Sequence, residues 1–313
     1  MTLPADPTVA FIGTGVMGAS MAGHLLDAGR RLVVFNRTRS RAAALIERGA
    51  TWAQTAGEAA SKADVVITMV GYPSDVEDVY FGPSGILENA SEGAILVDMT
   101  TSSPALAQRI ASAAEMRGLH ALDAPVSGGD VGARNATLTI MVGGSEQTFA
   151  DAEPLLQVMG TNVVLQGASG AGQHTKMANQ VAIAGSMLAT VESLAYAQSA
   201  GLDPRRVLLS IGAGSAASWS LANLAPRILD GDFAPGFYVK HFIKDMRIAL
   251  ESAAEMGLVL PGLSKAKRLY DTLAWGGGSD LGTQALWLLY ADDEARVRHG
   301  VDPKATASRV IGE

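Results

Sequence analysis

A lysine and two amides recur at helical spacing in a stretch that carries no other charge. The segment 170–189 contains Lys176, Asn179 and Gln180 among mostly apolar residues. At about 100° per residue the three lie on one face of a helix. A lysine so placed can exchange a proton with a carbonyl/alcohol pair, and the amides can orient the reacting oxygen or a carboxylate. The alternative is a lysine whose ammonium reaches solvent, with surface amides.

A second candidate is the segment DAPVSGG at 123–129. Pro125 stiffens the end of a predicted strand, and the next residues offer a hydroxyl and exposed backbone N–H groups. A concave set of such donors suits a carboxylate, so Ser127, Gly128 and Gly129 are predicted to bind one. A plain turn is the alternative.

The segment GTGVMG follows the β-rich run TVAFI and precedes a helical pattern. Its glycines permit a tight turn and the close approach of a pyrophosphate to a helix N-terminus. A glycine turn that closes a strand–helix unit without a ligand is the alternative. We predict cofactor contacts along the whole turn, which comprises Gly13, Thr14, Gly15, Val16, Met17 and Gly18.

The end of the second predicted strand favours one dinucleotide over the other. NAD sites usually carry an acidic residue there, which bonds the ribose 2′-hydroxyl. This chain has Asn36, Arg37 and Thr38 instead. No carboxylate would repel a 2′-phosphate, Arg37 can pair with it and Thr38 can donate a hydrogen bond. We therefore predict NADP(H) in preference to NAD(H); in the alternative, the arginines begin a solvated helix and NAD binds weakly through Asn36.

Two further strand ends are predicted to lie at the ligand crevice of the sheet. Met69 and Val70 end the run DVVITMV, and Thr100 and Thr101 follow the run GAILVDM. Doubly wound sheets bind ligands at such ends, and Thr100 can approach the nicotinamide. For the segment Thr101–Ser103, capping of a helix that starts near Pro104 is an equal alternative.

Short β-rich runs alternate with helical patterns over the first half of the chain. This alternation predicts βαβ units and a mostly parallel, doubly wound α/β sheet of the Rossmann type. The strands are expected at 8–13, 31–36, 64–70, 93–99, 120–125, 137–144 and 162–167, and helices near 16–29, 39–48, 74–80 and 103–117.

The pattern changes after Gly172, where apolar residues recur at helical spacing to the end of the chain. We predict a dinucleotide-binding domain over 1–169 and an all-helical domain over 170–313. Breaks are expected at 201–204, 230–237, 259–262 and 275–280. The apolar run 181–200 is long enough to cross a bilayer. A central helix that is buried between domains or subunits is the preferred interpretation, and it favours a homodimer or homotetramer.

Composition excludes several classes of protein. The chain has 313 residues, no cysteine, five histidines and a net charge of −7. These values argue against a disulfide framework, a metal site, and binding to nucleic acid or an anionic membrane. The first residues, MTLPADPTVAFIG, lack the features of a signal peptide. We expect a soluble cytoplasmic protein.

Together the motifs resemble the β-hydroxyacid dehydrogenases, a family that includes 3-hydroxyisobutyrate dehydrogenase, tartronate semialdehyde reductase and succinic semialdehyde/glyoxylate reductases. The resemblance covers nearly the whole chain and rests on FIGTGVMGASMA, DAPVSGG, TLTIMVGG, GAGxxxKxxN and GFxxxxxIKD. It implies that Lys176 is catalytic and that Ser127–Gly129 and Asn179 bind the substrate carboxylate. It also implies that Thr100 and Lys244 contact the cofactor near the nicotinamide, although Lys244 alone would be interpreted as a solvated charge.

Some residues resemble particular subgroups of this family, and others depart from the usual family pattern. Gln180 resembles the tartronate semialdehyde reductases, and Asn36-Arg37-Thr38 resembles the NADPH-preferring semialdehyde reductases. Ala136 stands where many members have glycine, and the segment 280–290 is shorter than the family's usual loop. Trp219 is a candidate aromatic contact for the substrate.

The expected activity is the NADP(H)-dependent interconversion of a small carboxylate-bearing aldehyde and its hydroxy acid, with Lys176 as acid and base. The alternatives are an NAD-dependent 3-hydroxyisobutyrate dehydrogenase, an imine reductase-like enzyme, and an inactive NADP-binding interaction module. 6-Phosphogluconate dehydrogenase is related, but this chain is short for that enzyme's enlarged helical domain.

Overall fold

The computed structural model describes residues 3–310, which fold into two compact units. The units are Met1–Lys176 and Met177–Glu313, so the division falls inside a long helix rather than at the expected boundary between residues 169 and 170. That helix, α9 (Ala171–Ser199), begins in the first unit and continues in the second.

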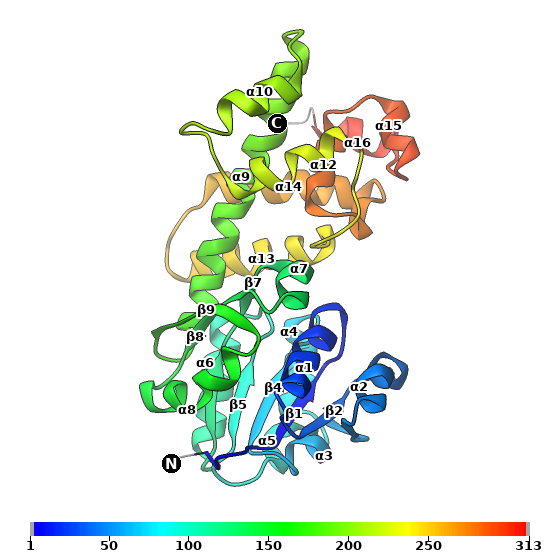
Figure 1. Cartoon of the computed structure of the whole chain (residues 1–313). Coiled ribbons are helices and arrows are strands. Elements are labelled where there is room, and N and C mark those ends of the chain that lie inside the picture. Colours follow the sequence, from blue (N-terminus) through cyan, green and yellow to red (C-terminus); the bar gives the residue numbers. More distant parts are fainter. Residues whose placement is uncertain (1–2, 311–313) are drawn as a thin grey trace. The chain divides into compact units, whose positions relative to one another are not determined.

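The first unit is built on a nine-stranded mixed sheet (Figure 1). Its parallel part has the order β3-β2-β1-β4-β5-β6, and β8 then runs antiparallel to β6 and to β7, while β9 pairs parallel with β8. The predicted doubly wound α/β sheet is confirmed. The strands are β1 (Val9–Ile12), β2 (Leu32–Phe35), β3 (Thr51–Trp52), β4 (Val65–Thr68), β5 (Ile95–Asp98), β6 (His120–Asp123), β7 (Val126–Ser127), β8 (Leu138–Gly143) and β9 (Gly160–Gly167).

Alternate residues of the central strands enter two different cores, because successive side chains of a strand point to opposite faces. Phe11 of β1 packs in the core on one face, which also holds Leu25 of α1 (Val16–Asp27). Ile12 packs in the core on the other face, with Tyr80 of α4 (Pro73–Phe81) and Ile110 of α6 (Pro104–Glu115). Both faces are covered, so the strands are continuously apolar, as is typical of parallel sheets.

The helices of the first unit include several with side-chain caps at their first turn. Thr55, Ser103 and Ser145 each accept a backbone N–H, and Pro104 follows Ser103 at the first helical position. Ser103 therefore acts as a helix cap. The helices are α1 (Val16–Asp27), α2 (Ala43–Glu47), α3 (Ala56–Ala60), α4 (Pro73–Phe81), α5 (Ile86–Asn89), α6 (Pro104–Glu115), α7 (Gly129–Arg134) and α8 (Glu146–Leu156), with a 3-10 turn, η1 (Arg39–Ala42).

Ala136, which was singled out in the sequence as a departure from the expected family pattern, lies in the turn before β8. Its backbone φ is 53°, in the left-handed region where a Cβ is strained by roughly 1–2 kcal/mol. Glycine at this position carries no such strain. The turn before β8 thus accepts alanine at an energetic cost that glycine would not carry.

In the part of the second unit that the structure describes, the elements are helical, as predicted, and one isolated bridge joins Tyr238 and Gly282. The expected breaks fall at junctions between helices, whereas the breaks at 212–218, 290–292 and 299–302 were not predicted. Besides most of α9, the unit contains α10 (Pro204–Ile211), α11 (Trp219–Asn223), α12 (Ala225–Leu229), α13 (Val239–Glu255), α14 (Pro261–Trp275), α15 (Asp293–Arg298) and α16 (Pro303–Val310), with the 3-10 turns η2 (Gly278–Asp280) and η3 (Thr283–Leu289). The short segment 280–290 is therefore mostly 3-10 helix, and its Leu286 and Leu288 are buried in the core of the unit.

Helix α9 buries one stripe of its surface in this chain. Ala184, Met187 and Val191 are fully buried, whereas small residues at 182, 185 and 189 are exposed. The homo-oligomer expected from this helix stays a prediction. Within residues 3–310, no helix combines the length and the apolar character that a membrane span requires.

Candidate functional site

The glycine turn after β1 fits tightly against its neighbours on one side. Gly13 has a φ of 98°, and a Cβ there would collide with the carbonyl oxygen of Met69. A Cβ at Gly18 would collide with the carbonyl oxygen of Gly13. These two glycines are therefore needed for the turn itself to form.

The same turn is open on its other side. Gly15 precedes α1, no side chain caps the helix, and a Cβ at Gly15 would meet nothing within 4 Å. The hydroxyl of Thr14 is buried without a hydrogen-bond partner. Open space above an uncapped helix start, beside an unsatisfied donor, suits a pyrophosphate. The predicted contacts Val16 and Met17 lie in the first turn of this helix.

This contrast gives a prediction about two alanine substitutions. Gly13→Ala is expected to lower the free energy of unfolding by at least about 2 kcal/mol, because of the positive φ and the collision. Gly15→Ala is expected to change it by less than ~0.5 kcal/mol, since its φ is −74°, yet to weaken NADPH binding at least about tenfold by filling the pyrophosphate's approach. Urea denaturation and fluorescence titration measure the two effects. Unchanged NADPH affinity in Gly15→Ala would contradict the assignment.

Both ends of the Asn36 carboxamide form a hydrogen bond within the protein. Its Oδ1 accepts from the backbone N of Thr14 at 3.0 Å, and its Nδ2 donates to the carbonyl of Thr38 at 2.9 Å. Asn36 therefore ties the glycine turn to the loop after β2. The cofactor contact predicted for Asn36 stays a prediction.

Arg37 lies beside the loop after β4. Its Nη1 is 2.9 Å from Oδ1 of Asp75 in the first turn of α4, and its side chain remains 81% exposed. The exposed pair contributes little to stability, but it holds the guanidinium near the strand ends. Thr38 precedes η1 and its side chain does not cap that turn.

The ends of β4 and β5 are linked by hydrogen bonds. The backbone N of Val70 donates to Oγ1 of Thr100 at 3.0 Å, and Thr100 N donates to Oδ1 of Asp98 at 3.1 Å. Met69, Val70 and Thr100, which were predicted separately, thus lie together beside Gly13. Thr100 is only 1% exposed, so its side chain is held inside the protein.

Asp98 is a buried carboxyl group that the motifs did not single out. Burial raises its pKa to about 6, against the opposing effect of hydrogen bonds from Thr68 and Thr100. Because the Thr68 hydroxyl donates to Asp98, the nearby Tyr80 hydroxyl is the donor to Thr68. Burial also raises the pKa of Tyr80. These hydrogen bonds fix the position of the last residue of β5 inside the protein.

The segment Ser127–Gly129, which is predicted to bind a carboxylate, forms the turn from β7 into α7. Gly128 and Gly129 have φ values of 130° and 63°, which favour glycine at both positions. Ser127 is half-buried at the end of β7, and no side chain caps α7. Asp130 follows in the first turn, and its carboxylate pairs with Arg134 at 2.7 Å.

Lys176 is 6% exposed and belongs to the first unit, whereas Asn179 and Gln180, one turn further along α9, belong to the second. Asn179 Nδ2 donates to Gln180 Oε1 at 2.8 Å, and Gln180 Nε2 donates to Oδ2 of Asp245 at 2.6 Å. Both ends of the Gln180 carboxamide are therefore used inside the protein. The substrate contacts predicted for the two amides stay predictions.

Lys244 and Asp245 form a buried ion pair on α13. The Lys244 Nζ lies 3.1 Å from Asp245 Oδ1, and the side chains are 6% and 1% exposed. With Gln180 and Asn179 they form a continuous polar chain across α13 and α9. Lys244 was predicted from the sequence as a site residue, whereas the part played by Asp245 was not. Trp219, at the start of α11, is 69% exposed.

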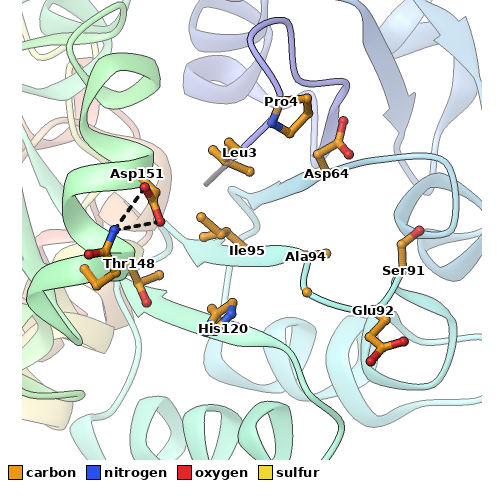
Figure 2. A pocket seen from close by; sticks show the side chains of 12 residues that line it. Leu3, Pro4, Asp64, Ser91, Glu92, Ala94, Ile95, His120, Thr148 and Asp151 are labelled. Carbon is orange, nitrogen blue, oxygen red and sulfur yellow. Dashed lines mark hydrogen bonds between the residues drawn. The ribbon is translucent and has the colours of Figure 1, made fainter. Parts of the chain in front are cut away.

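A cavity of about 70 Å³ lies at the opposite edge of the sheet (Figure 2). It is lined by residues that precede β1, β4 and β5, and by His120 at the start of β6. Ligands of doubly wound sheets bind at the carboxyl ends of strands, and this cavity is far too small for a dinucleotide. It is therefore not the candidate site. In the part of the chain that the structure describes, no cluster of His, Asp and Glu is arranged to hold a metal ion.

A doubly wound sheet with an open glycine turn at its carboxyl edge is the arrangement typical of dinucleotide-binding domains. Residues 8–167 match the family described as the NAD binding domain of 6-phosphogluconate dehydrogenase. Residues 170–290 match the family described as NAD-binding of NADP-dependent 3-hydroxyisobutyrate dehydrogenase. The chain belongs to the β-hydroxyacid dehydrogenase family, which places it among the NAD(P)-dependent hydroxyacid dehydrogenases.

Individual relatives agree with this membership. The chain is 58% identical to an uncharacterized oxidoreductase of Bacillus subtilis, over 90% of this chain and 98% of that protein. It is 39% identical to the 2-hydroxy-3-oxopropionate reductase of Escherichia coli, over 89% and 95%. A solved structure of Mycobacterium tuberculosis 3-hydroxyisobutyrate dehydrogenase with L-serine has a TM-score of 0.86 and 32% identity, over 92% and 100%.

Proposed function

We propose that this protein uses NADP(H) to interconvert a small carboxylate-bearing aldehyde and its hydroxy acid, with Lys176 as the acid and base. The observation that carries the proposal is the buried position of Lys176, at 6% exposure, in the same unit as the glycine turn and the Ser127–Gly129 turn. Burial holds the Lys176 ammonium away from bulk solvent, as a group that transfers a proton at a fixed place requires.

The cofactor, when bound, supplies or accepts the hydride. The protein's own groups bind and orient the reactants: the α1 N-terminus would hold the pyrophosphate, and the turn at 127–129 offers N–H groups and a hydroxyl to the substrate carboxylate. Lys176 donates a proton to the carbonyl oxygen during reduction and removes it from the hydroxyl during oxidation. A preplaced cation also stabilises the developing negative charge on that oxygen.

Two observations support NADP(H) over NAD(H). The loop after β2 carries no carboxylate. The Arg37 side chain is 81% exposed, and its exposed pair with Asp75 is weak enough for a 2′-phosphate to compete for the guanidinium. The remaining guanidinium N–H groups of Arg37 can bind a 2′-phosphate.

The proposed function is tested with a panel of aldehyde acids: succinic semialdehyde, glyoxylate, tartronate semialdehyde and methylmalonate semialdehyde, each with NADPH and with NADH. We expect oxidation of NADPH with at least one of them, and a poor rate with propionaldehyde, which lacks the carboxylate. Absence of oxidation of either cofactor across the whole panel would overturn the enzymatic proposal.

Arg37→Ala tests the cofactor preference separately. Loss of a charged hydrogen bond, worth roughly 1.5–3 kcal/mol, is expected to raise the KM for NADPH about 10- to 100-fold and to leave the KM for NADH nearly unchanged. Arg41→Ala, which removes an exposed arginine from the same loop region, is the matched control. Equal effects of Arg37→Ala on both cofactors would remove the basis for the preference.

A further inference from the structure

The carboxamide of Gln173, in the first turn of α9, is bonded at both ends to a loop outside its own helix. Its Oε1 accepts from the backbone N of Ser102 at 2.9 Å, and its Nε2 donates to the carbonyl of Thr100 at 2.8 Å. The side chain is fully buried. A single planar group thus pairs with one N–H and one C=O of the segment that follows β5.

The backbone of the same turn is anchored by Asp123, the last residue of β6. Asp123 Oδ2 accepts from Gln173 N at 2.8 Å, and its Oδ1 accepts from Gly170 N at 2.7 Å. A carboxylate is favourable at the N-terminus of a helix. Burial nevertheless raises the pKa of Asp123 above its usual value, against the lowering effect of these N–H groups.

The start of α9 has no room to move toward the sheet. A Cβ at Gly172 would collide with the carbonyl oxygens of Met141 and Asp123. A Cβ at Gly143 would come within 2.7 Å of the backbone N of Gly172. The helix therefore begins in direct backbone contact with β6 and β8, and Gln173 fixes its rotation relative to the loop after β5.

Lys176 lies three residues after Gln173, on the same side of the helix. Both residues belong to the first unit, together with Thr100. The hydrogen bonds of Gln173 thus connect the loop that carries Thr100, a predicted cofactor contact, to the helical turn that carries the proposed acid and base.

We propose that Gln173 is a positioning residue, which sets the place of the Lys176 ammonium relative to the reactants by holding α9 to the segment Thr100–Ser102. The proposal rests on the proposed function of Lys176. A misplacement of a catalytic group by about 1 Å can lower the rate roughly 100-fold. A residue that fixes the rotation of the helix carrying that group can therefore change the rate strongly. An ionised glutamate cannot donate to the Thr100 carbonyl, and asparagine is shorter by one methylene group.

A double-mutant cycle tests the proposal. The variants are Gln173→Met, which keeps the length of the side chain and removes both its hydrogen bonds, Lys176→Ala, and the combination. The single-turnover rate of NADPH oxidation is measured with the best aldehyde of the panel at saturation. We expect Gln173→Met to lower the rate roughly 10- to 100-fold in the unchanged protein, but less than about threefold when Lys176 is already alanine, because contacting or coupled residues are not additive.

Gln157→Met is the matched control, because Gln157 is an exposed residue directly after α8 and its Nε2 donates to Glu153 of that helix at 3.1 Å. It is expected to change neither rate. NADPH affinity and the melting temperature show whether each variant is folded. Should Gln173→Met not fold, Gln173→Leu replaces it in the cycle, since it also removes both hydrogen bonds and buries no charge.

The outcomes separate the two proposals. Equal rate losses from the Gln173 substitution in both backgrounds would mean that it acts independently of Lys176, and would overturn the positioning role. A normal rate in the single Gln173 variant would overturn it as well. A normal rate in Lys176→Ala alone would instead remove the proposed function, whatever the Gln173 variant does.

Discussion

Lys176→Ala is expected to lower the turnover number by about two to four orders of magnitude, the usual contribution of a positioned general acid or base. The substitution removes the only group proposed to move a proton at the reacting oxygen. It leaves the glycine turn and Arg37 unchanged, so the affinity for NADPH is expected to stay within about threefold of the original value. Steady-state assays with the best aldehyde, together with fluorescence titration of NADPH, measure both quantities.

The control for this substitution is Lys62→Ala. Lys62 is an exposed lysine that pairs with Glu58 on the surface of the first unit, and its loss is expected to leave turnover unchanged. A partial return of activity in Lys176→Ala on addition of ethylammonium would indicate that the missing group is the ammonium itself. Turnover of Lys176→Ala within threefold of the original value would exclude Lys176 as the acid and base.

Asp245→Ala is expected to lower the free energy of unfolding by about 3–5 kcal/mol, because breaking a buried ion pair leaves a charge in the interior. Asp245 is 1% exposed and interacts with both Lys244 and Gln180. Its loss removes the carboxylate that lies 3.1 Å from the Lys244 ammonium. Chemical denaturation of the purified variant measures the effect.

Asp271→Ala provides the matched control, since Asp271 pairs with Lys267 at 2.7 Å one turn away on α14 at the surface. Its cost is expected to be below about 1 kcal/mol. In the double variant Lys244→Met, Asp245→Leu both charges are gone, and much of the lost stability is expected to return. An equal loss of stability in Asp245→Ala and Asp271→Ala would contradict the importance of burial.

The main architecture could be predicted from local sequence because its signals are periodic. The strands β1, β4 and β5 are short apolar runs, and each is followed by a helical pattern, which together specify parallel crossover units. The glycine turn was also recognisable from local sequence, because its glycine spacing has a steric cause. A Cβ at Gly13 or Gly18 would collide with a backbone carbonyl oxygen. The two-residue strands β3 and β7 carry too few residues to show a period and were not predicted.

The buried hydrogen bonds that hold the site residues in place could not be predicted in the same way. Gln173 bonds to residues 71 and 73 positions earlier, and to Asp123 across 50 positions. No local pattern encodes such pairings, and Asp98, Asp123 and Asp245 resemble ordinary polar residues at the ends of strands and along a helix. A signal did exist for Gln173, because an amide one turn before Lys176 extends the polar stripe of α9. The same stripe predicted substrate contacts for Gln180, whose carboxamide the structure shows to be engaged by Asn179 and Asp245.

The continuity of α9 across the two units has a consequence for how this chain can change over evolution. Lys176 closes the first unit and Asn179 and Gln180 open the second, yet all three lie on one uninterrupted helix. Insertion or deletion of one residue between positions 176 and 179 would turn everything that follows by about 100° relative to the lysine. Length variation among descendants of this sequence should therefore accumulate in connections such as 212–218, and be absent from this single helical turn.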